Sequence, residues 1–173
     1  MSNFDIVIES KIDISNDEDI HEFEKICCDN DIKLISRYNL DRNNQITNSF
    51  LDSAISIFIG SDFINEIIEG TITGVLSSVI ISCITKIIKK FKSRKSYSNM
   101  EEIQLKSDKA RLLIRKTNLS DDEVKNAIDA FFKVSNSNPN YNEKIVVMNN
   151  NNIETLDILD FVNKYCRTEK KNG

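Results

Sequence analysis

Apolar and polar residues alternate at the start of the chain and then change to a helical spacing. The alternation over residues 4–14 predicts a β-strand. Apolar positions then recur at helical intervals up to Asn30, behind an N-cap at Ser15 or Asn16, and residues 32–40 return to an extended pattern. The first part of the chain is therefore expected to form a strand, a helix and a second strand.

The longest apolar segment covers residues 61–92 and is interpreted as one central helix. Acidic residues stand near its start and lysines near its end, which is the polarity that the helix macrodipole favours. A shorter helix, capped by Asn48 or Ser49, is expected before Gly60. The width of the apolar surface on the central helix predicts burial on more than one side.

Beyond the central helix the pattern predicts a β-hairpin and another helix. Apolar positions alternate over residues 103–106 and 110–116, on either side of a Ser-Asp-Lys turn. Ser120 stands three residues before Glu123, which is a capping box at the start of an amphipathic helix. After a polar segment, residues 144–148 are expected to be a strand.

A last helix is expected over residues 153–166, after a turn rich in asparagine. The resulting fold class is α+β, with a strand–helix–strand half, a long central apolar helix, and a β-hairpin with a capped helix; a ferredoxin-like arrangement is one version of it. We expect one α+β domain over residues 4–133, built around helix 61–92, and a small strand–helix extension over residues 140–167.

Small residues recur every four positions along the central helix. Such a stripe allows another backbone to approach closely, either in a membrane or where a helix crosses a sheet within the protein. The uncharged part of the helix is about 24 Å long at about 1.5 Å per residue, shorter than a hydrocarbon core of about 30 Å. Burial inside protein is favoured, and membrane insertion stays open as the alternative. The expected helix-packing stripe consists of Gly70, Gly74, Ser78 and Ser82.

A basic cluster closes the same helix. It is interpreted first as a solvated helix end, second as a contact for anionic lipid headgroups, and last as a nucleic-acid site, which is disfavoured because only Phe91 and Tyr97 could stack on bases. The cluster consists of Lys86, Lys89, Lys90, Lys92, Arg94 and Lys95.

Composition narrows the functional classes further. The net charge of −4 argues against a chain that binds polyanions over its whole surface. Four cysteines without a repeated spacing and a single histidine do not form a metal-binding pattern, and the sequence lacks the motifs of nucleotide-binding and hydrolytic enzymes. We therefore expect no catalytic residues, no cofactor and no metal. Because the sequence has no signal-peptide pattern, we expect a cytoplasmic protein with free thiols. Association with a membrane belongs only to the alternative in which the central helix inserts into the bilayer.

Three segments together resemble the effector-associated constant component family of bacterial conflict systems. They are FDIVIES with DIHEFEKICC, then FIGSDFINEIIEGTITGVLSSVIISCITKIIKKFKSRK, then EEIQLKSDKARLLIRKTNLSDDEVKNAIDAFF. The resemblance lies in the order of elements over residues 4–133; the helix end that is usually rich in arginine is here mostly lysine, and the part after residue 140 has no counterpart.

The resemblance implies a non-enzymatic adaptor encoded beside an effector, with that effector as its protein partner. The alternative is a membrane-anchored accessory or immunity-type protein with helix 61–92 in the bilayer. The sequence leaves the oligomeric state open.

Overall fold

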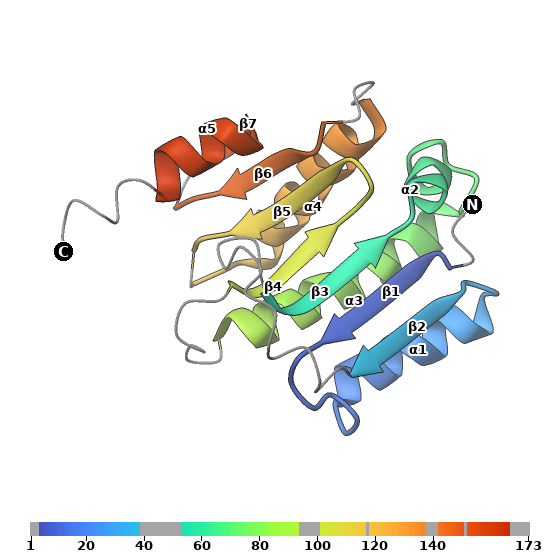
Figure 1. Cartoon of the computed structure of the whole chain (residues 1–173). Coiled ribbons are helices and arrows are strands. Elements are labelled where there is room, and N and C mark those ends of the chain that lie inside the picture. The colour runs from blue at the N-terminus through green and yellow to red at the C-terminus, as the bar shows by residue number, and fades with distance from the viewer. Residues whose placement is uncertain are drawn as a thin grey trace.

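The described part of the chain forms a mixed β-sheet with helices packed on it, which confirms the α+β class (Figure 1). The computed structural model describes residues 4–38, 53–93, 101–116, 118–137, 142–150 and 152–166. Within them the sheet has seven strands in the order β2-β1-β3-β4-β5-β6-β7. The strands are β1 (Ile6–Ser10), β2 (Leu34–Tyr38), β3 (Ser53–Ile59), β4 (Glu101–Lys106), β5 (Ala110–Ile114), β6 (Lys144–Met148) and β7 (Ile153–Asp157).

Parallel and antiparallel pairs alternate across this sheet from β1 onward. The parallel pairs are β1 with β2, β3 with β4, and β5 with β6, and each is joined by a helical crossover. Antiparallel pairing connects β1 with β3, β4 with β5, and β6 with β7. Because β6 pairs with β5, the segment expected as a C-terminal extension adds its strands to the same sheet.

The crossover helices cover one face of the sheet, and α3 lies between α1 and α4 (Figure 1). The helices are α1 (Glu18–Asp29), α2 (Ser61–Ile68), α3 (Gly74–Ser93), α4 (Asp121–Ser137) and α5 (Ile158–Phe161), which continues into a π-helical turn over Val162–Cys166.

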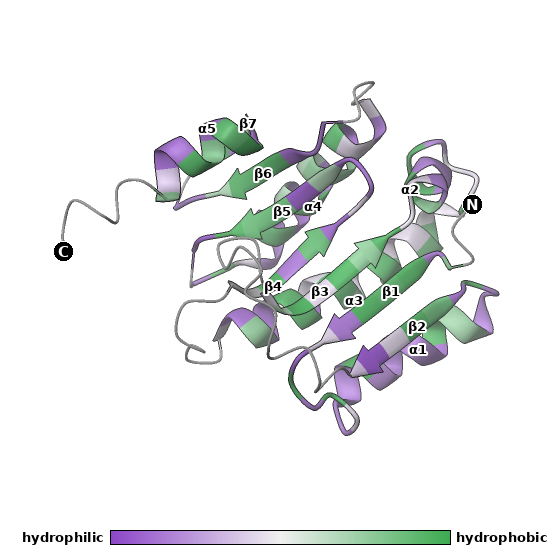
Figure 2. Ribbon diagram, in the orientation of Figure 1, coloured by the Kyte–Doolittle hydropathy of each residue, from purple (hydrophilic) through white to green (hydrophobic). Residues whose placement is uncertain are grey.

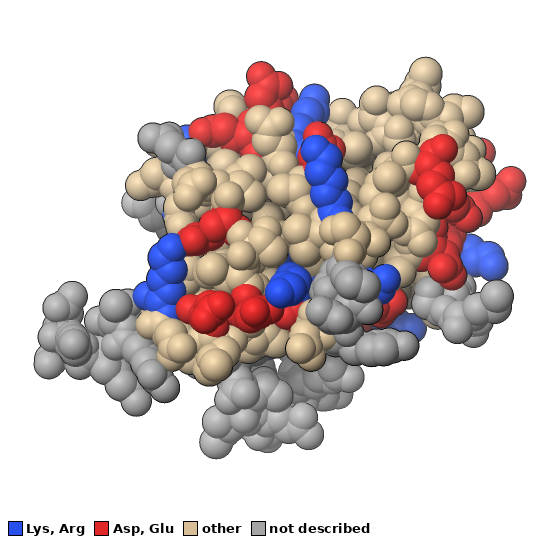
Figure 3. Space-filling model, turned by 90° about the horizontal axis from the view of Figure 1, so that it is seen from above, with Lys and Arg blue, Asp and Glu red and all other residues tan. Residues whose placement is uncertain are grey.

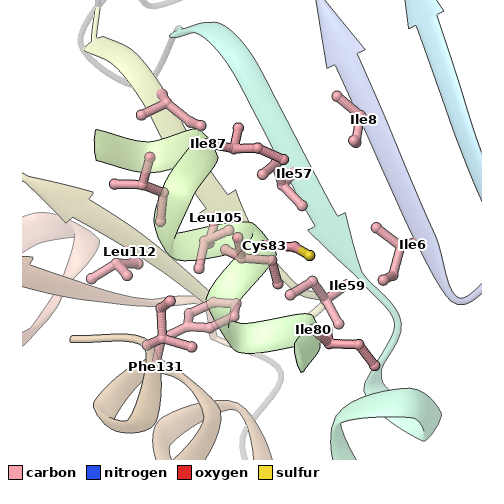
Figure 4. Packing of buried hydrophobic residues seen from close by; sticks show 14 of the residues in the cluster. Ile6, Ile8, Ile57, Ile59, Ile80, Cys83, Ile87, Leu105, Leu112 and Phe131 are labelled. Atoms are coloured by element: carbon pink, nitrogen blue, oxygen red, sulfur yellow. The ribbon is translucent and has the colours of Figure 1, made fainter. Parts of the chain in front are cut away.

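The main core lies between the sheet and these three crossover helices. Figure 4 shows Ile57 and Ile59 of β3 beneath Ile80 and Ile87 of α3, with Phe131 of α4 beside them. All five side chains are fully buried. Figure 2 shows the matching pattern, with strands coloured as hydrophobic for much of their length and α1 coloured partly hydrophilic and partly hydrophobic. The central helix buries one side against the sheet, and the burial on more than one side that its wide apolar surface predicted does not extend to Val75 and Val79, which are exposed.

A second, smaller core lies on the opposite face of the sheet. Leu113, Ile145 and Val147 alternate along β5 and β6 with residues of the main core, so they point away from it. Phe161 covers them, and the guanidinium of Arg115 lies 5.5 Å from the centre of its ring. The C-terminal helix therefore has its own packing site at the β5–β7 end of the sheet.

Several local predictions are confirmed. The backbone N–H of Ser120 donates to Glu123 Oε2 at 2.8 Å, and the N–H of Glu123 donates to Ser120 Oγ at 3.2 Å, which completes the capping box. The β4–β5 hairpin forms as expected, with the N–H of Ser107 donating to the carbonyl of Ala110 at 2.8 Å. The cap of α1 lies one or two residues later than expected, at Asp17, whose carboxylate accepts from the N–H of Ile20.

Two segments expected to be helical are strands. The short helix expected before Gly60 is wrong, because residues 53–59 form β3, an interior strand of the sheet that pairs with β1 and β4. Ile55, Ile57 and Ile59 alternate toward the main core, whereas Ser56 and Phe58 on the other face are only partly buried. The helix expected from Ile153 begins only at Ile158, because residues 153–157 pair with β6 as β7.

The expected single helix over residues 61–92 is also wrong. It is divided into α2 and α3 by residues 69–73, and Gly70 adopts a φ of 72°. This left-handed conformation does not belong to an α-helix and is readily adopted only by glycine among the common residues. Among the described residues, no helix combines the length and the apolar character needed to cross a membrane.

Candidate protein-docking groove

The basic cluster at the end of α3 is engaged by acidic residues at the start of α1. Lys86 Nζ lies 2.9 Å from Glu22 Oε2 and 3.8 Å from Asp19 Oδ1. Lys90 Nζ lies 2.9 Å from Asp17 Oδ2 and 3.0 Å from Asp19 Oδ2. Because α1 and α3 run antiparallel, the N-terminal acids of one helix meet the C-terminal lysines of the other, and both ends match the helix macrodipole.

The neighbouring helix α4 provides a further partner. Lys89 Nζ lies 2.5 Å from Asp121 Oδ1, in the first turn of α4. Lys92 is buried, and Arg94 and Lys95 lie outside the described residues. In the view of Figure 3, basic and acidic side chains lie side by side rather than in separate areas. The interpretation of the described cluster as a solvated helix end is therefore incomplete, since its lysines form ion pairs that connect α3 to the start of α1 and to α4.

The pKa shifts agree with permanent charge in these pairs. The hydrogen bond and attraction of Glu22 raise the pKa of Lys86, and the hydrogen bond and attraction of Lys89 lower the pKa of Asp121. Both shifts move the group further from neutrality. These side chains thus serve as fixed charges rather than as groups that exchange protons near pH 7.

A groove of about 650 Å³ opens on the N-terminal half of α3. Val75 and Val79 are among the residues that line it, and their exposed fractions are 78% and 36%. Ile26 of α1 and Asp121 of α4 contribute to its sides, and Cys83 lies in its lining. An apolar helix surface that stays open in the folded chain is typical of a protein interaction site.

The expected packing stripe lies in this groove rather than inside the protein. Gly74, Ser78 and Ser82 line the groove and are exposed, while Gly70 lies in the turn before α3. A Cβ atom placed on Gly74 would meet no heavy atom within 4 Å. Of the contacts that the sequence left open for this stripe, a contact with the chain's own sheet is not formed within the described residues, since α3 faces the sheet with Ile80, Ile84 and Ile87.

His21 lies outside this groove, on the exposed surface of α1. Its Nδ1 lies 3.1 Å from Glu24 Oε2, and its Nε2 lies 2.7 Å from the carbonyl of Ser15. These contacts raise the pKa of His21, with the Glu24 hydrogen bond as the largest cause.

The thiols differ in their surroundings. Cys27 and Cys83 are buried, Cys28 is exposed, and all are free. Burial raises the pKa of Cys27 to about 12 and also raises that of Cys83, so neither forms a thiolate near neutral pH. In the described part of the chain, no group of three His, Cys, Asp or Glu residues is arranged to hold a metal ion.

Sequence reasoning missed the groove because it placed Val75 and Val79 on buried faces of a continuous helix. The signal that could have located it is the segment EGTITG, in which Gly70 ends one helix and Gly74 begins the next. The helix therefore restarts at Gly74, and Val75 and Val79 lie in its first turns. The exposed apolar residues therefore lie where the helix begins.

Together, the fold and the groove define a mixed-sheet protein with crossover helices on one face, a short helix packed on the other, and an apolar groove on the middle crossover helix. Comparison with protein-family models, with curated proteins and with solved structures finds no match to this chain.

Proposed function

We propose that this protein is a non-enzymatic adaptor of a bacterial conflict system, which acts by contact with a protein partner. The observation that carries the proposal is the groove on α3, where Val75 is 78% exposed beside Val79 and Ile26. Leaving such side chains in water is unfavourable, by about 25 cal/mol for each Å² of apolar surface, and a partner that covers them recovers this free energy. The resemblance in element order adds the expectation that the partner is an effector encoded nearby.

The charge arrangement supports a contact through the groove rather than through the lysines. Lys86, Lys89 and Lys90 already have carboxylate partners, so a polyanion would have to compete with them. A partner in the groove meets side chains that need no rearrangement. Such contacts between preformed surfaces involve little change in backbone structure.

A two-hybrid assay against the products of the genes that flank its own would test the proposal. We expect one of these products to bind the wild-type protein, and Val75→Glu to abolish binding by placing a charge in the apolar contact. Leu159→Glu is the matched control, since Leu159 is 67% exposed on α5, which packs on the opposite face of the sheet. The proposal fails if no flanking product binds, or if both variants reduce binding equally.

A further inference from the structure

Within the described residues the sheet has two edges, formed by β2 and β7. Each of these strands has a single strand neighbour. The N–H of Ile6 donates to the carbonyl of Lys33, so the backbone groups of Leu34, the next residue of β2, point away from β1. The N–H of Leu34 already donates to the carbonyl of Ile32 at 3.1 Å. The edge at β2 is therefore partly engaged by its own chain.

The turn that joins β6 to β7 shows which backbone groups of β7 point outward. The N–H of Asn149 donates to the carbonyl of Asn152 at 2.9 Å. Bonded and non-bonded pairs alternate along an antiparallel ladder, so the next residues of β7 that bond to β6 are Glu154 and Leu156. The backbone groups of the residues between and beside them point away from β6. These residues are Ile153, Thr155 and Asp157.

The pairing of β6 with β5 gives the same assignment. The N–H of Arg115 donates to the carbonyl of Met148 at 2.8 Å, so the backbone groups of Met148 are turned toward β5. Met148 is the residue opposite Ile153. The backbone groups of Ile153 are therefore left to the outer edge of the sheet, and those of Thr155 and Asp157 follow at the same spacing of two residues.

The edge at β7 also lacks the usual features that block pairing. Its five residues include no proline, lysine or arginine. Thr155 and Asp157 are exposed. An occupant must supply N–H and carbonyl groups at matching intervals, which is what a further β-strand does. The chemistry of the edge therefore specifies a strand as its occupant.

The pattern of outward groups is its own complement. Thr155 is the middle residue of β7, and its backbone groups face outward. A symmetry axis beside it lets each Thr155 N–H donate to the Thr155 carbonyl of a second copy. Each Asp157 N–H then donates to the Ile153 carbonyl of that copy. Glu154 stands opposite Leu156, so no two like charges face each other directly across the pair.

We propose that β7 is a dimerisation edge, at which a second copy of this chain adds its own β7 in antiparallel orientation and extends the sheet. The symmetry axis is perpendicular to the sheet, so the crossover helices of both copies lie on the same face. The helix α3 contacts β4, and β5 and β6 separate β4 from β7. The groove on α3 stays open in the dimer, and the proposal does not depend on the adaptor function.

Sedimentation velocity of the full-length protein over a range of concentrations tests the proposal. We expect a dimer whose dissociation constant increases by about tenfold or more with Thr155→Pro. Proline removes an N–H that points outward, so it leaves the bonds between β6 and β7 in place. The matched control is Thr155→Val, which keeps the N–H and the branched shape of the side chain and should dimerise like the wild-type protein.

A second variant separates loss of pairing from loss of folding. Thr155→Lys keeps the backbone N–H but places two lysines opposite each other at the symmetry axis. It should weaken the dimer by about tenfold or more, and added salt should recover part of this loss. Thermal unfolding followed by circular dichroism should show that Thr155→Pro and Thr155→Lys both fold.

The register of the two strands has its own measurement. Directly opposite residues in a bonded pair have Cα atoms about 5.5 Å apart, within the range that a disulfide spans. Diamide, which oxidises two thiols to a disulfide, should therefore cross-link Thr155→Cys into a dimer in a Cys28→Ser background. Asp157→Cys in the same background should not cross-link, because its two copies lie about 13 Å apart at about 3.3 Å per residue.

Three results would overturn the proposal. The first is a protein that stays monomeric up to about 100 μM. The second is a dimer that Thr155→Pro and Thr155→Lys leave intact, or that cross-links as readily at residue 157 as at residue 155. The third is a flanking gene product whose binding Thr155→Pro abolishes, since that partner would then supply the strand. A dimer that binds no flanking product refutes only the adaptor proposal.

Discussion

Replacing Gly70 or Gly74 with alanine should change the stability of the protein in opposite directions. The two positions lie four residues apart, and an added Cβ would meet no heavy atom within 4 Å at either of them. Only the backbone differs, because Gly70 has a φ of 72° and Gly74 is the first residue of α3. The same substitution therefore separates the effect of backbone conformation from the effect of packing.

The magnitudes follow from these conformations. Alanine at Gly70 must adopt the left-handed region, which costs about 1–2 kcal/mol, partly offset by the lower entropy of the unfolded chain. Alanine at Gly74 meets no such strain, so the change in the unfolded chain should stabilise the protein by about 0.4–1 kcal/mol. For a chain of 173 residues, 1 kcal/mol corresponds to a change in melting temperature of about 2–4 °C.

Thermal unfolding followed by circular dichroism measures both variants under the same conditions. We expect Gly70→Ala to melt below the wild-type protein and Gly74→Ala to melt above it. An increase for Gly70→Ala equal to that for Gly74→Ala would refute the reasoning, because it would mean that residue 70 is helical and that α2 and α3 are one helix. A large decrease for Gly74→Ala would mean instead that another part of the chain packs on the groove.

Three further predictions concern titration and thiol reactivity. Hydrogen bonds to Glu24 and to the Ser15 carbonyl raise the pKa of His21 above 6.5. The stabilising effect of the charged imidazole is therefore complete below pH 6.5 and is lost as the pH rises through the folded-state pKa. NMR titration of this sole histidine should give a pKa above 6.5, and His21→Ala should remove this pH dependence of stability. The hydrogen bond from Lys116 and that from the Ser120 backbone lower the pKa of Glu123 from 4.5 to about 2. The contribution of the Glu123 carboxylate to stability is therefore lost as the pH falls between these two values. In acid unfolding, Glu123→Gln should lose less stability than the wild-type protein over this pH range. At neutral pH a thiol reagent should modify Cys28, which is exposed, and leave the buried Cys27, whose pKa is about 12, unmodified until the protein unfolds. Peptide mass mapping that finds Cys27 modified in the folded protein would contradict this prediction.

The parts of the fold that could be predicted are those whose signal is local. The Ser120–Glu123 capping box and the hairpin around Ser107 depend on residues within a few positions of each other, and both are confirmed. β3 depends on pairing with β1 and β4, which are distant in the sequence. β7 pairs with β6 across a short turn, and it was missed because the helical spacing that begins at Ile158 was extended back to Ile153. In residues 53–59, Ile55, Ile57 and Ile59 alternate as in a strand, but Ala54, Ile55 and Phe58 also fit a helical spacing, so the pattern alone did not select the strand.

The candidate site shows the same division between local and distant causes. The small residues of α3 were located correctly along the helix, since helical spacing alone places Gly74, Ser78 and Ser82 on one side. Whether that side is buried depends on where α1 and α4 lie, and this is set by the order of strands in the sheet. The partners of the lysines were equally inaccessible to sequence reasoning, because Lys90 and Asp19 are 71 residues apart.

The two halves of α3 therefore differ in what they leave available for a partner. Ion pairs between exposed side chains add little to stability, so the acids around Lys86 and Lys89 have a small effect on the free energy of unfolding. Their larger effect is on binding, because a phosphate or a lipid headgroup near these lysines must replace a carboxylate that is already in place. On the N-terminal half, Val75 and Val79 are exposed apolar side chains, which form no ion pairs. A partner of the proposed kind that covers these two side chains would therefore not have to displace a carboxylate from a lysine.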